Sequence, residues 1–102
     1  MGVEIKKERN GNVLTIYLSG RVAVKEAEEL GKVVRSELDG ITDLIFDLEE
    51  LSYITSAGLR VFLMGQSSMD EVEGKMKLIH VSKLVRDLLD MTRFSDFMKI
   101  EE

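Results

Sequence analysis

The sequence predicts an α/β domain built on one mixed β-sheet, in which an N-terminal hairpin is followed by strands that alternate with helices. The pair Asn10-Gly11 is the strongest short hairpin signal, and it separates residues 3–8 from residues 13–18, two segments with strand-like patterns. Helical periodicity then alternates with short apolar runs, which is typical of parallel strands joined by crossover helices. Because no strand–helix–strand unit comes before the hairpin, the order differs from that of doubly wound nucleotide-binding folds.

The first half of the chain continues from the hairpin into a helix and a strand. The pair Ser19-Gly20 is expected to end the second strand of the hairpin. Apolar residues at spacings of three and four predict an amphipathic helix over residues 24–39, with Gly40 at the position where many helices end in a left-handed residue. The compact apolar run at residues 44–48 predicts a strand that is covered on both faces.

The second half is expected to repeat this alternation. A turn through residues 49–51 leads to a second helix at about residues 56–73, and residues 76–81 are predicted to form the next strand. Ser82 is a suitable N-cap for a third helix, and residues 97–100 favour a final short strand. The complete order is β-β-α-β-α-β-α-β, with right-handed crossovers that place helices over at least one face of the sheet.

Length and composition exclude several functions. The 102 residues fit one domain spanning 1–102, and a net charge of −5 argues against a nucleic-acid partner, because phosphate backbones require clustered Lys and Arg. Cysteine is absent and His80 is the one histidine, which excludes thiolate chemistry and His-rich metal centres. No apolar run approaches the ~20 residues that span a bilayer, and the N-terminus lacks a signal-peptide pattern. We therefore expect a cytoplasmic domain without direct membrane insertion.

The most informative segment begins where the apolar strand ends and a helix is expected to start at Thr55 and Ser56. Helix capping explains one hydroxyl, and Thr55 is the expected cap, with its oxygen accepting a backbone N–H. Ala57-Gly58 then leave the first turn almost without side chains, so that a large partner could approach an exposed Ser56. Because a helix N-terminus favours negative charge, these features suit a phosphoacceptor better than a nucleophile.

The run from Asp47 to Arg60, with Thr55-Ser56-Ala57-Gly58-Leu59 at its centre, resembles the signature of STAS domains, specifically of bacterial anti-sigma factor antagonists. The length and element order of the whole chain also match that family, including Leu18-Ser19-Gly20 in the predicted hairpin. The resemblance implies that Ser56 is the residue phosphorylated by a partner kinase. It also implies a partner-binding surface made by Gly20, Arg21, Val22, Ala23, Tyr53, Thr55, Ser56, Ala57, Gly58, Leu59 and Arg60.

This resemblance implies a binding switch without catalysis or a cofactor of its own. The unphosphorylated chain would bind an anti-sigma factor with serine kinase activity, and a serine phosphatase would reset the phosphorylated form. Ala23 and Thr55 stand where the family often has Asp, which favours an alternative. That alternative is a STAS scaffold or subunit of a larger complex, such as a lipid-transport ATPase or a stress-signalling assembly, acting without phosphorylation. A small-anion or nucleotide-binding domain is a second alternative.

Two further groups of residues are expected to have no special chemistry. Asp47, Glu49 and Glu50 are similar to a Mg²⁺ cluster, but carboxylates that follow a strand are usually solvated. His80 has no second ligand near it in the sequence and is expected to be a structural or exposed histidine. The sequence therefore predicts no metal site.

Overall fold

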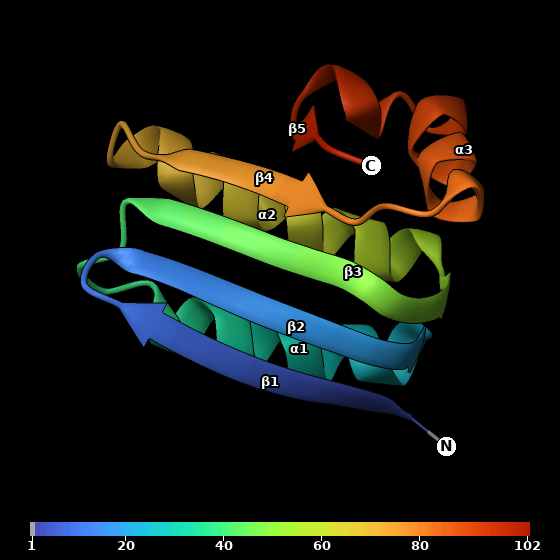
Figure 1. Cartoon of the computed structure of the whole chain (residues 1–102), viewed down its shortest axis with the longest axis horizontal. Helices are drawn as coiled ribbons and strands as arrows, with labels where there is room; N and C mark the ends of the chain where they lie inside the picture. Colours follow the sequence, from blue (N-terminus) through green and yellow to red (C-terminus); the bar gives the residue numbers. More distant parts are fainter. Residues whose placement is uncertain (1) are drawn as a thin grey trace.

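The computed structural model describes residues 2–102, which form a mixed sheet with three helices and confirm the predicted fold class. The strands lie in the sheet in chain order, the first two antiparallel and the rest parallel (Figure 1). The elements are β1 (Val3–Asn10), β2 (Val13–Val22), α1 (Val24–Glu37), β3 (Asp43–Ile54), α2 (Ser56–Glu71), β4 (Lys75–Ile79), α3 (Lys83–Met91), a 3-10 turn (Phe94–Asp96) and β5 (Lys99–Ile100).

The N-terminal hairpin forms as predicted, but its two turn residues are Gly11 and Asn12, one position later than the predicted Asn10-Gly11, because Asn10 still belongs to β1. Asn10 pairs with Val13, and Gly11 between them has a φ of +65°, the left-handed conformation that the turn requires. The predicted end of the second strand at Ser19-Gly20 is wrong, because β2 continues to Val22. The register between β2 and β3 shifts near these residues, and Gly20 adopts a φ of +99° within the irregularity, so that pairing resumes beyond it.

Strand β3 is longer than its apolar run predicts. Residues 49–51 do not form a turn, because they continue β3 and pair with the second half of β2, with Glu50 opposite Ser19. The expectation that both faces of this strand are covered is also wrong, since burial alternates along it. Leu44 and Phe46 are fully buried, whereas Ile45 between them remains partly exposed on the face that lacks helices.

The core lies between the sheet and the two helices α1 and α2, which cover the same face (Figure 1). Phe46 on β3 and Phe62 on α2 are fully buried, and their ring centroids lie 4.8 Å apart at an angle of 55°. Helix α3 lies beyond the β4 side of the sheet, and the 3-10 turn and β5 follow it in the chain (Figure 1). Among the described residues, no helix is long and apolar enough to cross a membrane.

Three predicted ends of elements differ from the structure by two residues. Helix α1 ends at Glu37, α2 ends at Glu71 and β4 ends at Ile79, each slightly before its predicted end. Ser82 caps α3 as predicted, since its hydroxyl oxygen accepts a hydrogen bond of 3.3 Å from the backbone N–H of Val85.

Candidate functional site

Two helices begin side by side at the end of the sheet where β2 and β3 finish. Because β2 and β3 are parallel, their C-terminal ends lie together, and α1 and α2 start immediately after them. The carbonyl oxygen of Val22 accepts two hydrogen bonds from Thr55, one from the backbone N–H at 2.9 Å and one from Oγ1 at 3.3 Å. These bonds fix the start of α2 against the end of β2.

Thr55 and Ser56 have different roles at this end of the sheet. Thr55 occupies the N-cap position, but the prediction that its hydroxyl accepts a helix N–H is wrong, because Oγ1 donates to Val22 instead. Ser56 is the first residue of α2 and is exposed, as predicted. Within residues 2–102, no hydrogen bond engages the Ser56 hydroxyl, so that it remains available for chemistry with an approaching partner.

Gly58 packs against the strands and does not face solvent. A Cβ atom at this position would lie 2.5 Å from Cγ1 of Ile54 and 2.8 Å from Cγ1 of Val22. A glycine near a helix start indicates either close packing or access for a partner, and at Gly58 the structure shows close packing, because its small size lets α2 approach the sheet closely. Val22 and Leu59 are buried as well, so these three members of the predicted partner-binding set support the surface from below.

The remaining predicted residues are exposed or partly exposed and lie at the ends of β2 and β3 and in the first turn of α2. Arg21 and Tyr53 face each other across β2 and β3, and the guanidinium carbon of Arg21 lies 4.5 Å from the centroid of the Tyr53 ring. Gly20 is held near the same ends of β2 and β3, because its carbonyl oxygen accepts a 2.9 Å hydrogen bond from the Ser52 hydroxyl. Arg60 is exposed one helical turn after Ser56 and lies on the same side of α2.

A shallow groove between α1 and α2 extends this surface beyond the residues that the sequence predicted. It has a volume of about 260 Å³ and is lined by Val24, Ala27, Glu28, Gly31, Arg35, Ala57, Arg60 and Val61. Val24 is 63% exposed. Neither Arg35 nor Arg60 forms an ion pair with a carboxylate among residues 2–102. Helical periodicity places Val24 near the apolar face of α1, but only the packing of the two helices shows that its side chain stays accessible.

A second polar cluster lies on the face of the sheet without helices. Nδ1 of His80 is 3.0 Å from Oδ1 of Asp47 and 4.0 Å from Oε1 of Glu49. His80 is thus exposed and satisfied by a carboxylate, as the sequence predicted, and its partners are residues distant from it in the sequence. The pairing of Asp47 with Ile79 across β3 and β4 brings them together, since it places the residue after Ile79 beside the Asp47 carboxylate.

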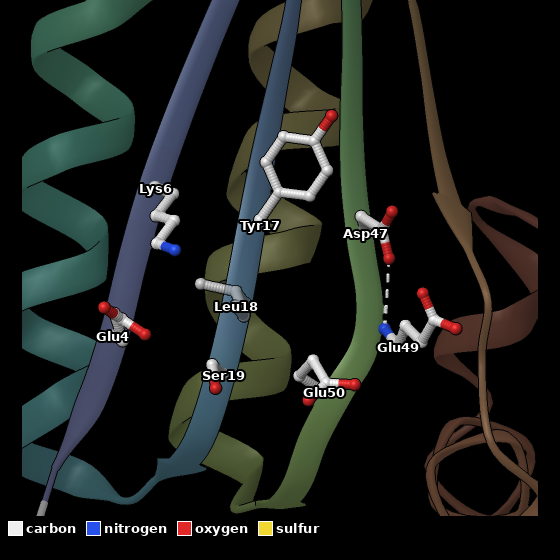
Figure 2. A pocket seen from close by; sticks show the side chains of 8 residues that line it. All are labelled: Glu4, Lys6, Tyr17, Leu18, Ser19, Asp47, Glu49 and Glu50. Atoms are coloured by element: carbon white, nitrogen blue, oxygen red, sulfur yellow. Dashed lines mark hydrogen bonds between the residues drawn. The ribbon is translucent and has the colours of Figure 1, made fainter.

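The same face is hollowed next to this cluster. Figure 2 shows Asp47 and Glu49 on β3, with the Asp47 carboxylate accepting a 3.1 Å hydrogen bond from the Glu49 backbone N–H. The hollow has a volume of about 330 Å³ and is lined by Glu4, Lys6, Tyr17, Leu18, Ser19, Asp47, Glu49 and Glu50. Four carboxylates and one lysine make its lining predominantly acidic.

The hydrogen bond to Asp47 raises the pKa of His80 above its ordinary value of 6.5, and the charge of the same carboxylate adds to the effect. We expect an NMR titration of the imidazole to give a pKa above 6.5 in the wild type and a lower pKa in Asp47→Asn. The imidazolium–Asp47 pair should stabilise the fold fully below about pH 6.5, and this stabilisation should disappear as the pH rises through the raised pKa. Glu49→Gln is the control, and it should lower the pKa of His80 less than Asp47→Asn does. An unchanged pKa of His80 in Asp47→Asn would contradict this account.

Comparison with known proteins identifies the family. The family model described as "STAS domain" matches residues 4–102. The chain belongs to the STAS domain family. The resemblance of the segment around Ser56 is thus confirmed at the level of the family, and the match includes the starts of α1 and α2 and the sheet from the second residue of β1 onward.

Two relatives of this STAS domain are anti-sigma factor antagonists by name. BtrV of Bordetella bronchiseptica, a candidate anti-sigma factor antagonist, is 29% identical over 93 residues, which cover 90% of this chain and 80% of BtrV. The anti-sigma-B factor antagonist of Staphylococcus aureus is 24% identical over 103 residues, covering 100% of this chain and 95% of the relative. The chain is therefore a STAS domain similar to anti-sigma factor antagonists.

Solved structures share the fold. A candidate anti-sigma factor antagonist of Thermotoga maritima has a TM-score of 0.88 at 19% identity, covering 96% of this STAS domain and 86% of that chain. The anti-sigma factor antagonist SpoIIAA in its unphosphorylated form has a TM-score of 0.79 at 19% identity, and the match covers 97% of this STAS domain and 87% of that chain. The phosphorylated form of SpoIIAA from Bacillus has a TM-score of 0.77 at 19% identity, and the match covers 95% of this STAS domain and 90% of that chain.

Proposed function

We propose that this STAS domain is a non-catalytic cytoplasmic switch that binds an anti-sigma factor with serine kinase activity. The unphosphorylated form makes the complex, phosphorylation of Ser56 ends it, and a serine phosphatase restores the binding form. Two comparisons support the proposal. The named relatives are antagonists of anti-sigma factors, and SpoIIAA, which shares the fold, has been solved both with and without phosphate.

The observation that carries this proposal is the exposed, unengaged hydroxyl of Ser56 at the first position of α2. A phosphate at this position adds about −1.5 to −2 charges beside the unpaired backbone N–H groups of the helix start. Negative charge there stabilises a helix by about 0.3–1 kcal/mol. The fold should therefore accept the modification while the charge of its binding surface changes.

The exposed side chains around Ser56 supply the contacts that the phosphate would disturb. Arg21 and Tyr53 lie at the ends of β2 and β3, just before the helix starts, and Arg60 lines the groove between α1 and α2. We expect a partner that contacts both places to cover Ser56, which begins α2 between them in the chain. Added bulk and charge at its hydroxyl would then separate the two surfaces by steric exclusion and repulsion.

We expect phosphate transfer to occur at Ser56 and not at Thr55. The Thr55 hydroxyl already donates to the Val22 carbonyl, so that it is held toward the sheet and away from a kinase. The test is transfer from radiolabelled ATP by the kinase-like anti-sigma factor of the same genome, with wild type, Ser56→Ala and Thr55→Ala as substrates. Ser56→Ala should lose the label and Thr55→Ala should keep most of it. Undiminished labelling of Ser56→Ala would overturn the assignment.

A scaffold that binds the same surface without phosphorylation is a second candidate. It is favoured by Ala23 and Thr55, which stand where the family often has Asp at this end of the sheet. Ala23 and Thr55 are the N-cap residues of α1 and α2, and in the switch an acidic side chain at these positions is expected to contact the kinase. The phosphotransfer assay separates the two functions when binding is measured in parallel. Tight binding of the kinase-like partner without any labelling of the wild type would replace the switch with the scaffold.

A further inference from the structure

The cluster of Asp47, Glu49 and His80 lies apart from the Ser56 surface and has a ligand set that the sequence spacing conceals. Asp47 and Glu49 belong to β3, whereas His80 follows β4 and is brought to them by the parallel pairing of the two strands. One donor atom from each residue lies within 4.8 Å of the other two. We propose that these three side chains bind a divalent transition-metal ion of the zinc class.

The distances suit such an ion with little rearrangement. Zinc binds imidazole nitrogen and carboxylate oxygen at about 2.0–2.2 Å, so that tetrahedral donor atoms are about 3.3 Å apart. The separation of His80 Nδ1 from Asp47 Oδ1 is 3.0 Å, and its separation from Glu49 Oε1 is 4.0 Å. On metal binding, the separation of His80 from Asp47 must increase slightly and the separation of His80 from Glu49 must decrease. The Glu49 side chain is 69% exposed and can make the larger movement.

Charge also favours a cation at this place. Among residues 2–102, neither Asp47 nor Glu49 forms an ion pair with Lys or Arg, and both depend on the single imidazole of His80. The adjacent hollow adds the carboxylates of Glu4 and Glu50 against a single lysine, Lys6, so that its lining stays negative (Figure 2). The hydrogen bond to His80 accounts for the position of Asp47, but a single imidazolium can neutralise only one of the two negative charges on Asp47 and Glu49. A divalent ion would neutralise the charges of both carboxylates.

The donor types indicate which ion is preferred. A neutral imidazole combined with two carboxylates suits zinc and related ions, whereas Mg²⁺ and Ca²⁺ prefer oxygen ligands alone. Asp47 is held in place by β3, since its side chain is only 12% exposed and accepts a hydrogen bond from the Glu49 N–H. Bound metal would connect β3 to the segment that leads from β4 into α3, leaving one coordination position for water.

The composition of the chain makes the test unusually clean. His80 is its one histidine and cysteine is absent, so that the imidazole signals in a tag-free protein belong to one residue. Zinc chloride is titrated at pH 7 while the imidazole nitrogens are followed by NMR and the heat of binding by calorimetry. We expect saturable 1:1 binding with a shift of the Nδ1 signal. His80→Gln and Asp47→Asn should each weaken the affinity at least tenfold.

Glu71→Gln is the matched control, because it removes one negative charge from an exposed position at the end of α2 and should leave the zinc affinity unchanged. Circular dichroism of each variant confirms that it is folded. The proposal is overturned by a wild type without saturable binding below millimolar zinc, or by His80→Gln binding as tightly as the wild type. Displacement of zinc by an equal concentration of Mg²⁺ also contradicts it, since that result indicates a carboxylate site for hard cations.

Discussion

Phe62→Ala is expected to lower the free energy of unfolding by about 3–5 kcal/mol. Phe62 is fully buried on α2, and its ring packs at 4.8 Å against that of Phe46 on β3, at the centre of the contact between helix and sheet. Truncation leaves a cavity that the surrounding strands can close only in part. Since small domains are stable by about 5–15 kcal/mol in total, this one change removes a large fraction of the stability.

Denaturant unfolding followed by circular dichroism measures the effect. Phe97→Ala is the matched control, because the same atoms are removed from a side chain that is 60% exposed, and its cost should stay within about 0.5 kcal/mol. If Phe62→Ala does not fold, Phe62→Leu provides a milder change at the same site, with a smaller loss expected. Equal losses for Phe62→Ala and Phe97→Ala would contradict the described core.

Gly58→Ala is expected to destabilise the domain by about 1–3 kcal/mol, even though alanine is the better helix former by about 1 kcal/mol. The added Cβ would lie 2.5 Å from Cγ1 of Ile54 and 2.8 Å from Cγ1 of Val22, so that the helix start must move away from the strands. Such a movement would also displace Ser56, two residues earlier. A reduced rate of Ser56 phosphorylation should accompany the loss of stability.

A second helical glycine provides the control for this prediction. Gly31 in α1 is also buried, but the nearest atom to its added Cβ is the Arg35 guanidinium nitrogen at 3.4 Å, at the end of a flexible side chain. Gly31→Ala should therefore be neutral or stabilising by up to about 1 kcal/mol. Thermal and denaturant unfolding measure the stability of both variants. An increase in stability for Gly58→Ala, as for Gly31→Ala, would mean that helix propensity outweighs packing at Gly58.

Elements controlled by local chemistry could be predicted from the sequence. The hairpin turn needs a left-handed residue and has Gly11 there, and Ser82 caps α3 through a neighbour only three positions away. The length of β3 could not be predicted in this way. Its polar half around Glu49 and Glu50 has the composition of a turn, and it becomes strand only because β2 continues past an irregularity to pair with it.

The candidate site shows the same division between local and distant causes. The exposure of Ser56 follows from its place at a helix start, which the hydroxyl pair and the preceding strand already indicated. The partner of the Thr55 hydroxyl is 33 positions away in the chain, and so is the partner of His80. Spacing along the sequence contains no information on such contacts, which depend on the register between parallel strands.

The strand order has a consequence for how this domain can associate with other chains. Strand β1 forms one edge of the sheet, and residues 4–9 of it include five charged side chains, while the opposite edge, β5, has only the two residues Lys99 and Ile100. Charged and very short edge strands disfavour the addition of a further strand and so protect a protein against edge-to-edge aggregation. We therefore expect that partners recognise side chains at the helix starts, while the sheet itself resists extension into fibrils at high cellular concentration.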